Sequence, residues 1–297
     1  MNEIIKKLQE AYPMGSIIDI ERLASGNSSQ AQLVKTQERH YILRQLMSND
    51  QAEAEYEVTR RLAGTHISPE ILLTKNGEPC IQVGKYVYNL QVFLPNEVNH
   101  DQGIDYSYLG RIIGLFHKQI SDMNPSLGQP DRFNLIKEWT KLQETNVSLP
   151  KQVVDLINDA IENQLPVTGY IHGDLGKWNL LFNHNRIHII DFGEVRQGNL
   201  HFDIAAIMLT TFNWQLPDVH LINQLRSFAE GYLLTNQPII WSQLITSINL
   251  WIARGIVVII NQFGQTNDVD DYIKAELSKQ IRILQLINTL KNEQSVI

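Results

Sequence analysis

Cysteine is the scarcest residue in this sequence. Cys80 is the only cysteine among 297 residues. A single thiol excludes an internal disulfide framework and fits a reducing compartment. The opening residues, MNEIIKKLQEAYPMGS, mix acids and lysines with the apolar positions and lack the apolar core of a signal peptide. These two absences predict a cytoplasmic protein.

A long apolar run and an excess of positive charge are also absent. The most apolar segment, residues 248–261, is interrupted by Arg254 and is shorter than the roughly 20 residues that span a bilayer. We therefore interpret it as a buried helix and expect no membrane partner. The chain has 25 Lys and Arg against 32 Asp and Glu, a net charge of -7. No basic surface for a nucleic acid is expected, and a small cationic molecule suits this charge better.

The change of pattern along the chain predicts an α+β protein with two lobes. A chain of 297 residues that is 43% hydrophobic lies near the length at which one core divides into two. Residues 17–93 alternate as short strands do, around one helix at about 50–63, and the remainder is mainly helical. We expect an N-lobe of residues 1–94 with a small antiparallel β-sheet, and a larger, mostly helical C-lobe of residues 95–297.

Periodicity gives the expected elements. The predicted strands, five or six in one sheet, cover residues 17–23, 31–36, 40–46, 70–74, 80–83 and 86–93, and a first helix ends near Pro13. In the C-lobe, helical periodicity covers residues 108–120, 153–164, 203–214, 221–234 and 272–290. The segments NLLF and IHII, joined by the turn NHNR, predict one β-hairpin among these helices.

Three residues whose side chains carry oxygen atoms lie before, at the start of and at the end of this predicted hairpin. Asp174 lies in the preceding loop, HGDLGKWN, while Asn179 begins the hairpin and Asp191 ends its second strand in IIDFGE. A hairpin returns its chain, so Asn179 and Asp191 can approach each other. Such ligands suit Mg²⁺, which takes one or two protein carboxylates and completes its shell with water and substrate phosphates. Asp174 would then be free to orient a hydroxyl and accept its proton.

These motifs resemble those of the kinase-like phosphotransferases, which include aminoglycoside phosphotransferases, choline kinases and homoserine kinases. HGDLGKWN is similar to their catalytic loop, and IIDFGE is similar to the metal-binding segment that protein kinases carry as Asp-Phe-Gly. The resemblance implies a protein-kinase-like fold and transfer of the γ-phosphoryl group from Mg-ATP to a small-molecule alcohol. The implied catalytic residues are Asp174, His172 and Lys177, and the implied metal ligands are Asn179 and Asp191.

The resemblance also implies roles in the N-lobe. LASGNSSQAQLVKT would cover the phosphates, and VFLPNE would be the hinge whose backbone meets the adenine. Glu55 would pair with Arg44 of the strand YILRQ, although Glu53 and Glu57 on the same helix leave open that all three acids are solvated. Asp203, in FDIA, would support the catalytic loop. The implied nucleotide-binding residues are Ser25, Gly26, Ser28, Ser29, Arg44, Glu55, Phe93 and Leu94.

The sequence departs from the family pattern at three points. Arg44 stands where protein kinases carry a lysine, and its planar fork differs from an ammonium group. The phosphate loop has only Gly26, so its grip would depend on serines and backbone N–H groups. Gly176 replaces the lysine that protein kinases place two residues after the catalytic Asp. This last difference points away from protein substrates, as does the short stretch between DFGE and FDIA.

Two other interpretations remain open. A regulatory or scaffold protein could keep nucleotide binding and lose useful transfer, and the departures at Arg44 and in the glycine-poor loop leave room for it. Imidazole and carboxylate groups together also bind zinc or iron. The histidines that invite this interpretation are His172, His184, His188 and His201. No motif identifies the acceptor, which could be of the aminoglycoside, choline or homoserine type.

Overall fold

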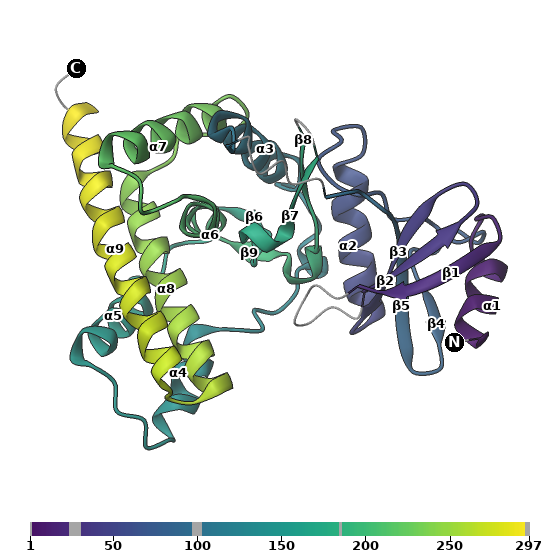
Figure 1. The fold of residues 1–297 in the computed structure, drawn as a ribbon, viewed down its shortest axis with the longest axis horizontal. Coiled ribbons are helices and arrows are strands. Elements are labelled where there is room, and N and C mark those ends of the chain that lie inside the picture. Colours follow the sequence, from purple (N-terminus) through teal and green to yellow (C-terminus); the bar gives the residue numbers. More distant parts are fainter. Residues whose placement is uncertain (1, 24–30, 97–102, 184–185, 295–297) are drawn as a thin grey trace. The chain divides into compact units, whose positions relative to one another are not determined.

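The computed structural model describes residues 2–23, 31–96, 103–183 and 186–294 (Figure 1). Its helices are α1 (Asn2–Ala11), α2 (Asn49–Arg61), α3 (Tyr106–Gln119), α4 (Leu135–Gln143), α5 (Lys151–Glu162), α6 (His201–Thr211), α7 (Asp218–Leu233), α8 (Trp241–Phe263) and α9 (Asn267–Gln294). Its strands are β1 (Ile17–Arg22), β2 (Ala31–Thr36), β3 (His40–Leu46), β4 (Ile81–Val83), β5 (Tyr86–Val92), β6 (Gly169–Ile171), β7 (Leu180–Asn183), β8 (Arg186–Ile189) and β9 (Arg196–Gly198). Short 3-10 helices are η1 (Pro125–Leu127), η2 (Lys177–Asn179) and η3 (Phe192–Glu194).

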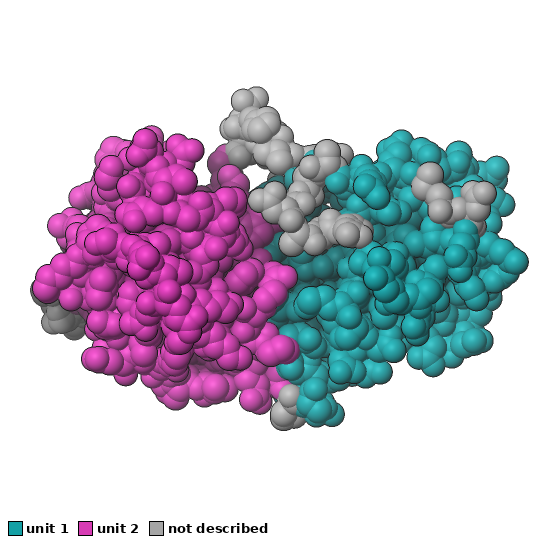
Figure 2. Space-filling view, turned by 90° about the horizontal axis from the view of Figure 1, so that it is seen from below, with its two compact units in different colours: residues 1–102, 122–129, 179–195 teal, residues 103–121, 130–178, 196–297 magenta. Residues whose placement is uncertain are grey.

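By its contacts the chain divides into two compact units (Figure 2). The first comprises residues 1–102, 122–129 and 179–195, and the second comprises the remainder. The hairpin β7–β8 belongs to the first unit because, for example, the N–H of Ile189 donates to the carbonyl oxygen of Ile67 at 2.7 Å. The division into lobes at residue 94 remains a prediction.

One antiparallel sheet organises the first unit, with strands in the order β1-β2-β3-β5-β4 (Figure 1). Leu43 of β3 faces Leu90 of β5 in register, and both are fully buried. They share a core with Val34, with Leu8 of α1 and with Tyr12, which follows α1. Apolar side chains on alternate positions of these strands therefore build the core, as the sequence predicts.

Helix α2 packs against β3 and β5, and its first turn explains where it begins. Ser48 accepts a hydrogen bond from the N–H of Gln51 at 3.2 Å, and the Gln51 side chain accepts one from the N–H of Met47 at 2.8 Å. These two bonds satisfy two backbone donors at the N-terminus of the helix. Gln51 also bonds Glu55, one turn further along α2, at 3.0 Å.

The predicted strand at residues 70–74 is wrong. Only Ile71 forms a bridge, with Gln91 of β5. The chain then turns at Gly77, whose φ is 85°. The N–H of Thr74 bonds the carbonyl oxygen of Glu78 at 2.8 Å, so it closes the turn and does not extend the ladder.

The second unit is mainly helical, and α8 packs against α4, α5, α6 and α9 (Figure 1). Helix α8 has 23 residues, which by length and composition is enough to cross a membrane. Half of its most apolar stretch is nevertheless buried inside the protein, and the core helix of a folded protein meets the same criteria. The helix extends beyond the apolar segment of residues 248–261 on both sides, so the length of that segment alone does not decide whether it could span a membrane. The burial agrees with the interpretation as a core helix.

Candidate active site

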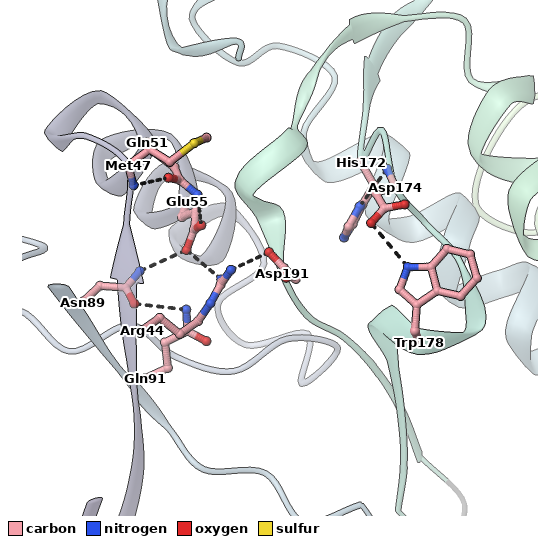
Figure 3. Close-up of polar contacts among 10 residues, drawn as sticks. All are labelled: Arg44, Met47, Gln51, Glu55, Asn89, Gln91, His172, Asp174, Trp178 and Asp191. Carbon is pink, nitrogen blue, oxygen red and sulfur yellow. Dashed lines mark hydrogen bonds and ion pairs between the residues drawn. The ribbon is translucent and has the colours of Figure 1, made fainter. Parts of the chain in front are cut away.

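Arg44 is the centre of a buried charge network in the first unit (Figure 3). Its Nη1 donates to Oε2 of Glu55 at 3.0 Å, and its Nη2 donates to Oδ1 of Asp191. Glu55 is fully buried and Arg44 is 8% exposed, whereas Glu53 is exposed. Of the acids on α2, Glu55 is therefore the one that pairs with Arg44, and a role of this pair in binding nucleotide stays a prediction.

The charges in this network depend on one another. Burial opposes a charged guanidinium, but the carboxylates of Glu55 and Asp191 outweigh it and raise the pKa of Arg44. Burial raises the pKa of Glu55, and Arg44 opposes that rise. A guanidinium that spans two carboxylates has donors enough to exchange one partner for a phosphate oxygen and keep the other.

Amide side chains hold Glu55 from α2 and β5 (Figure 3). Nε2 of Gln51 donates to Oε1 of Glu55 at 3.0 Å, and Nδ2 of Asn89 donates to Oε2 at 3.0 Å. Gln91 in turn donates to Asn89 at 3.4 Å. Gly193 leaves room for this arrangement, since a Cβ there would lie 2.5 Å from Nε2 of Gln51. The sequence prediction missed Asn89 and Gln91; their signal was two polar residues at alternate positions of an otherwise apolar strand.

Asn179 and Asp191 flank the β7–β8 pair. Leu180 faces Ile189 in register, and the N–H of Ile190 donates to the carbonyl oxygen of Asn179 at 3.0 Å. This confirms the predicted hairpin. Asp191 follows with φ at 65°, an uncommon conformation for a residue with a side chain, and its side chain is 35% exposed. A partly exposed carboxylate and an amide oxygen are ligands of the kind that Mg²⁺ takes, so the donor set fits this ion.

In the second unit, Asp203 of α6 holds the loop that carries His172 and Asp174. Its Oδ2 accepts the N–H of His172 at 2.6 Å, and its Oδ1 accepts the N–H of Gly173 at 3.0 Å. Nδ1 of His172 accepts the N–H of Asp174 at 3.4 Å. Asp203 and His172 are fully buried. The predicted support of this loop by Asp203 is confirmed.

The carboxylate of Asp203 is itself held by α3 and α7. Nε2 of His117 lies 3.1 Å from Oδ2 of Asp203, and Nδ1 of His117 lies 2.9 Å from the hydroxyl of Tyr232. Burial alone would raise the pKa of Asp203, but the bonds from His117 and from the backbone of His172 outweigh burial and lower it. Three helices therefore keep an ionised group beneath the loop.

Arg254 of α8 is a second anchor of the same loop. Its Nη1 donates to the carbonyl oxygen of Gly173 at 3.5 Å. Its Nε donates to the carbonyl oxygen of Phe133 at 2.9 Å, and its Nη2 donates to Asp131 at 3.1 Å. Arg254 is 7% exposed. In the sequence, Arg254 was recognised only as an interruption of an apolar run. A charge within a helix expected to be buried needs polar partners, and this was the signal that Arg254 anchors another segment.

Asp174 bonds a tryptophan (Figure 3). Nε1 of Trp178 donates to Oδ2 of Asp174 at 3.3 Å, and the N–H of Gly176 donates to the carbonyl oxygen of Asp174 at 2.9 Å. The N–H of Lys177 donates to Oγ1 of Thr210 at 3.0 Å, and the side chain of Lys177 is exposed. A catalytic role of Lys177 stays a prediction.

The remaining predicted nucleotide-binding residues divide into two groups. Those of the phosphate loop lie outside the described residues: Ser25, Gly26, Ser28 and Ser29. Phe93 and Leu94 of the predicted hinge are half-buried. The N–H of Phe93 donates to the carbonyl oxygen of His40 at 3.1 Å. An adenine at this segment would therefore meet backbone groups other than the Phe93 N–H.

The histidines do not form a metal cluster within the described ranges, where no three His, Cys, Asp or Glu gather in a group that could hold a metal ion. Nε2 of His201 accepts the N–H of Ile240 at 2.9 Å, and its Nδ1 lies 2.9 Å from Oδ1 of Asn199. Burial, and secondarily the proximity of His117, lower the pKa of His201 to about 4. His201 is thus a neutral structural residue, and His184 lies outside the described residues.

Most of the chain matches the model of one protein family. The model of the phosphotransferase enzyme family, APH, matches residues 19–241. No curated protein sequence matches the chain.

Several solved structures share the fold. Amicoumacin kinase hAmiN, in complex with AMP-PNP, Ca²⁺ and Ami, is 14% identical, with 94% of this chain and 92% of that chain covered and a TM-score of 0.74. Spectinomycin phosphotransferase APH(9)-Ia, in complex with ADP and spectinomycin, is 14% identical, with 97% and 96% covered and a TM-score of 0.68. Choline kinase LicA from Streptococcus pneumoniae is 14% identical, with 96% and 98% covered and a TM-score of 0.62. At these identities the likeness establishes the fold, and the predicted protein-kinase-like architecture is confirmed.

Proposed function

Because this chain belongs to the phosphotransferase enzyme family, we propose that it transfers the γ-phosphoryl group of Mg-ATP to a hydroxyl of a small-molecule acceptor. The use of ATP is supported by the AMP-PNP and ADP in complexes of proteins that share its fold. A small acceptor is supported by the amicoumacin, spectinomycin and choline named for those proteins. The net charge of -7 favours an acceptor that carries an amine.

The observation that carries the proposal is the position of Arg44 between Glu55 and Asp191. Glu55 is fully buried and fixes one side of the guanidinium, while Asp191 is partly exposed and holds the other. Such a guanidinium can bind a phosphate oxygen in place of Asp191. Asp191 and Asn179 would then hold Mg²⁺, which neutralises phosphate charge when bound.

The mechanism assigns the acid–base step to Asp174. Phosphoryl transfer asks little covalent chemistry of the protein, so positioning and charge stabilisation supply the catalysis. Asp174 orients the acceptor hydroxyl and accepts its proton as the oxygen bonds the γ-phosphorus and the bond to ADP breaks. Asp203 and Arg254 keep the backbone next to Asp174 in place through Gly173. Nδ1 of His172 accepts a hydrogen bond from the N–H of Asp174.

Acceptor-dependent release of ADP tests the proposal. The full chain with Mg-ATP would be assayed against aminoglycosides, choline, ethanolamine, homoserine and methylthioribose. We expect release with one acceptor well above the rate without acceptor, and a phosphorylated product in equal amount. Mg-ATP binding without ADP release from any of the panel would favour a regulatory or scaffold protein. That second candidate is motivated by Arg44, which stands where protein kinases carry a lysine.

The proposal includes a cytoplasmic location, because the single cysteine, Cys80, fits a reducing compartment. Helix α8 is half buried along its most apolar stretch, which supports a core helix and not a span. Neither a nucleic acid nor a membrane is proposed as a partner.

A further inference from the structure

Trp178 has no part in the reaction as described so far, yet it touches the proposed base. Trp178 is 57% exposed and is one of the large apolar residues that the described chain leaves in solvent. A single exposed aromatic residue is ordinary. What distinguishes Trp178 is that its ring is held by a hydrogen bond, by the loop backbone and by a second tryptophan.

The hydrogen bond and the backbone contact come from the loop itself. Nε1 of Trp178 donates to Oδ2 of Asp174 at 3.3 Å (Figure 3). The ring lies across Gly176, since a Cβ at that position would lie 2.3 to 2.5 Å from three atoms of the indole. A residue with a side chain at position 176 would therefore displace the ring. The absence of a side chain at Gly176 and the bond from Trp178 to Asp174 belong to one arrangement.

The second tryptophan connects this arrangement to α8. The rings of Trp178 and Trp251 stack with centroids 6.4 Å apart and an angle of 24° between their planes. Trp251 packs edge-on against Phe202 at 5.2 Å, and the guanidinium of Arg254 lies 5.9 Å from its ring. Arg254 also bonds the carbonyl oxygen of Gly173. The indole of Trp178 thus rests on the helix that anchors the loop, so its N–H is a fixed donor.

We propose that Trp178 is a positioning residue for Asp174, an inference that rests on the proposed function. The indole N–H fixes the plane of the carboxylate and hence the direction in which it receives the acceptor proton. A small misplacement of a reacting group costs a large factor in rate, since catalysis of this kind depends on a near-attack geometry. Trp178 bonds the proposed base and none of the residues proposed to hold the nucleotide, so its removal lowers kcat and leaves the KM for ATP unchanged.

The kinetic test is Trp178→Phe, which keeps a ring for the stack and removes the N–H. We expect kcat with the identified acceptor to fall about tenfold, with the KM for ATP and the midpoint of thermal unfolding unchanged. Trp241→Phe, the same chemical change at the first residue of α8, is the matched control and should behave as the wild type. Wild-type kcat in Trp178→Phe would overturn this inference alone, whereas a wild type without acceptor-dependent turnover would overturn the proposed function with it.

A double-mutant cycle separates a role through Asp174 from an independent one. In the Asp174→Asn background, Trp178→Phe should have no further effect, because the base that it positions is gone. The same tenfold loss in both backgrounds would contradict the proposal. Gly176→Ala provides a second route, since it displaces the ring and keeps the indole N–H. It should lower kcat as Trp178→Phe does, and unchanged kcat in Gly176→Ala would count against the arrangement.

A spectroscopic test reads the hydrogen bond without catalysis. The indole N–H groups of the five tryptophans give separate signals in a ¹H–¹⁵N spectrum, and Trp178→Phe assigns that of Trp178. We expect Asp174→Asn to move the Trp178 signal and to leave the Trp241 signal in place, because the charged acceptor is lost at Asp174 only. A Trp178 signal that does not respond to Asp174→Asn would contradict the bond and overturn the proposal.

Discussion

Glu55 is an example of a charged side chain whose burial depends on several partners. It is fully buried, and its carboxylate accepts hydrogen bonds from Arg44, Gln51 and Asn89. Removing a carboxylate from water costs several kcal/mol unless such partners replace the lost solvation. Glu53, two residues earlier on α2, is exposed and carries no comparable constraint.

Glu55→Ala is therefore expected to destabilise the fold. Arg44, which is 8% exposed, would lose its fully buried partner, and removal of one member of a buried pair costs about 3–5 kcal/mol. The free energy of unfolding in urea measures the loss, which should lie at the lower end because Asp191 still pairs with Arg44. Glu53→Ala is the control and should change stability by less than about 0.5 kcal/mol. Equal effects of the two changes would refute the network.

His201 predicts a dependence of stability on pH. Nε2 of the neutral ring accepts the N–H of Ile240, and burial lowers the pKa of His201 from 6.5 to about 4. Between these values the unfolded chain binds a proton that the folded chain excludes. The stabilisation is therefore complete above about pH 6.5 and decreases as the pH falls toward 4, by up to about 3 kcal/mol.

The measurement compares unfolding in urea at about pH 7 and about pH 5. The wild type should lose more stability between these two values than His201→Gln, whose side chain does not titrate. Parallel losses in the two proteins would mean that His201 is not the group responsible. Because other groups titrate in both proteins, the difference between the two losses isolates the histidine.

At the scale of elements, the sequence predicted the strands and helices that have a clear apolar periodicity. The strand AQLVKT is β2 as predicted, and HYILRQL is β3, because their apolar alternation matches the buried face of one sheet. The pair β6–β9 was missed, since each strand has three residues and the partners are distant in sequence. Helix α4 was also missed, although Asn134 caps it by accepting the N–H of Lys137 at 3.2 Å.

Motif and spacing also identify most residues of the candidate site, and the roles of these residues stay predictions. Asp174, Asn179 and Asp191 follow from motif and spacing, and Glu55 from the expected ion pair with Arg44. The bond from Trp178 to Asp174 was not predictable, although the two residues are only four apart, because it depends on an indole ring that lies across Gly176. Contacts of this kind depend on the conformation of an irregular loop, which leaves no periodic signal in the sequence.

Close packing of α3 on α7 gives a prediction about an element. A Cβ at Gly231 of α7 would lie 1.9 Å from the carbonyl oxygen of Ser107, and a Cβ at Gly110 of α3 would lie 2.1 Å from that of Phe228. Gly231→Ala should therefore force the helices apart and cost about 1–3 kcal/mol or more of unfolding free energy. Gly15→Ala, where a Cβ would meet nothing within 4 Å, is the control. A Gly231→Ala protein as stable as the control would contradict this packing.

At the scale of the whole molecule, the proposed reaction uses residues of both compact units. Arg44, Asn179 and Asp191 belong to the first unit, and His172 and Asp174 belong to the second. The first set is proposed to hold the nucleotide and its metal, and the second to activate the acceptor. Binding of ATP and turnover can therefore be separated by substitutions in one unit or the other.

Asp191→Asn tests the nucleotide half. Asparagine tolerates the left-handed backbone at this position, so the change removes charge and keeps the conformation. Calorimetry measures the factor by which Mg²⁺ lowers the Kd for ATP. This factor should be about tenfold or more smaller in Asp191→Asn than in the wild type, because a charged ligand of the ion is lost. Asp122→Asn, a change to an exposed residue of the same unit, should behave as the wild type. An unchanged response to Mg²⁺ in Asp191→Asn would exclude Asp191 as the ligand.

The most direct test of the central claim is the turnover of Asp174→Asn beside the wild type, with Mg-ATP and the acceptor that the panel identifies. The substitution keeps the shape of the side chain and removes its basicity. We predict that kcat falls by roughly 10² or more while the affinity for ATP stays the same, since loss of a general base costs about that factor. Turnover in Asp174→Asn comparable with that of the wild type would contradict the assignment of Asp174 as the base, and with it the proposed mechanism.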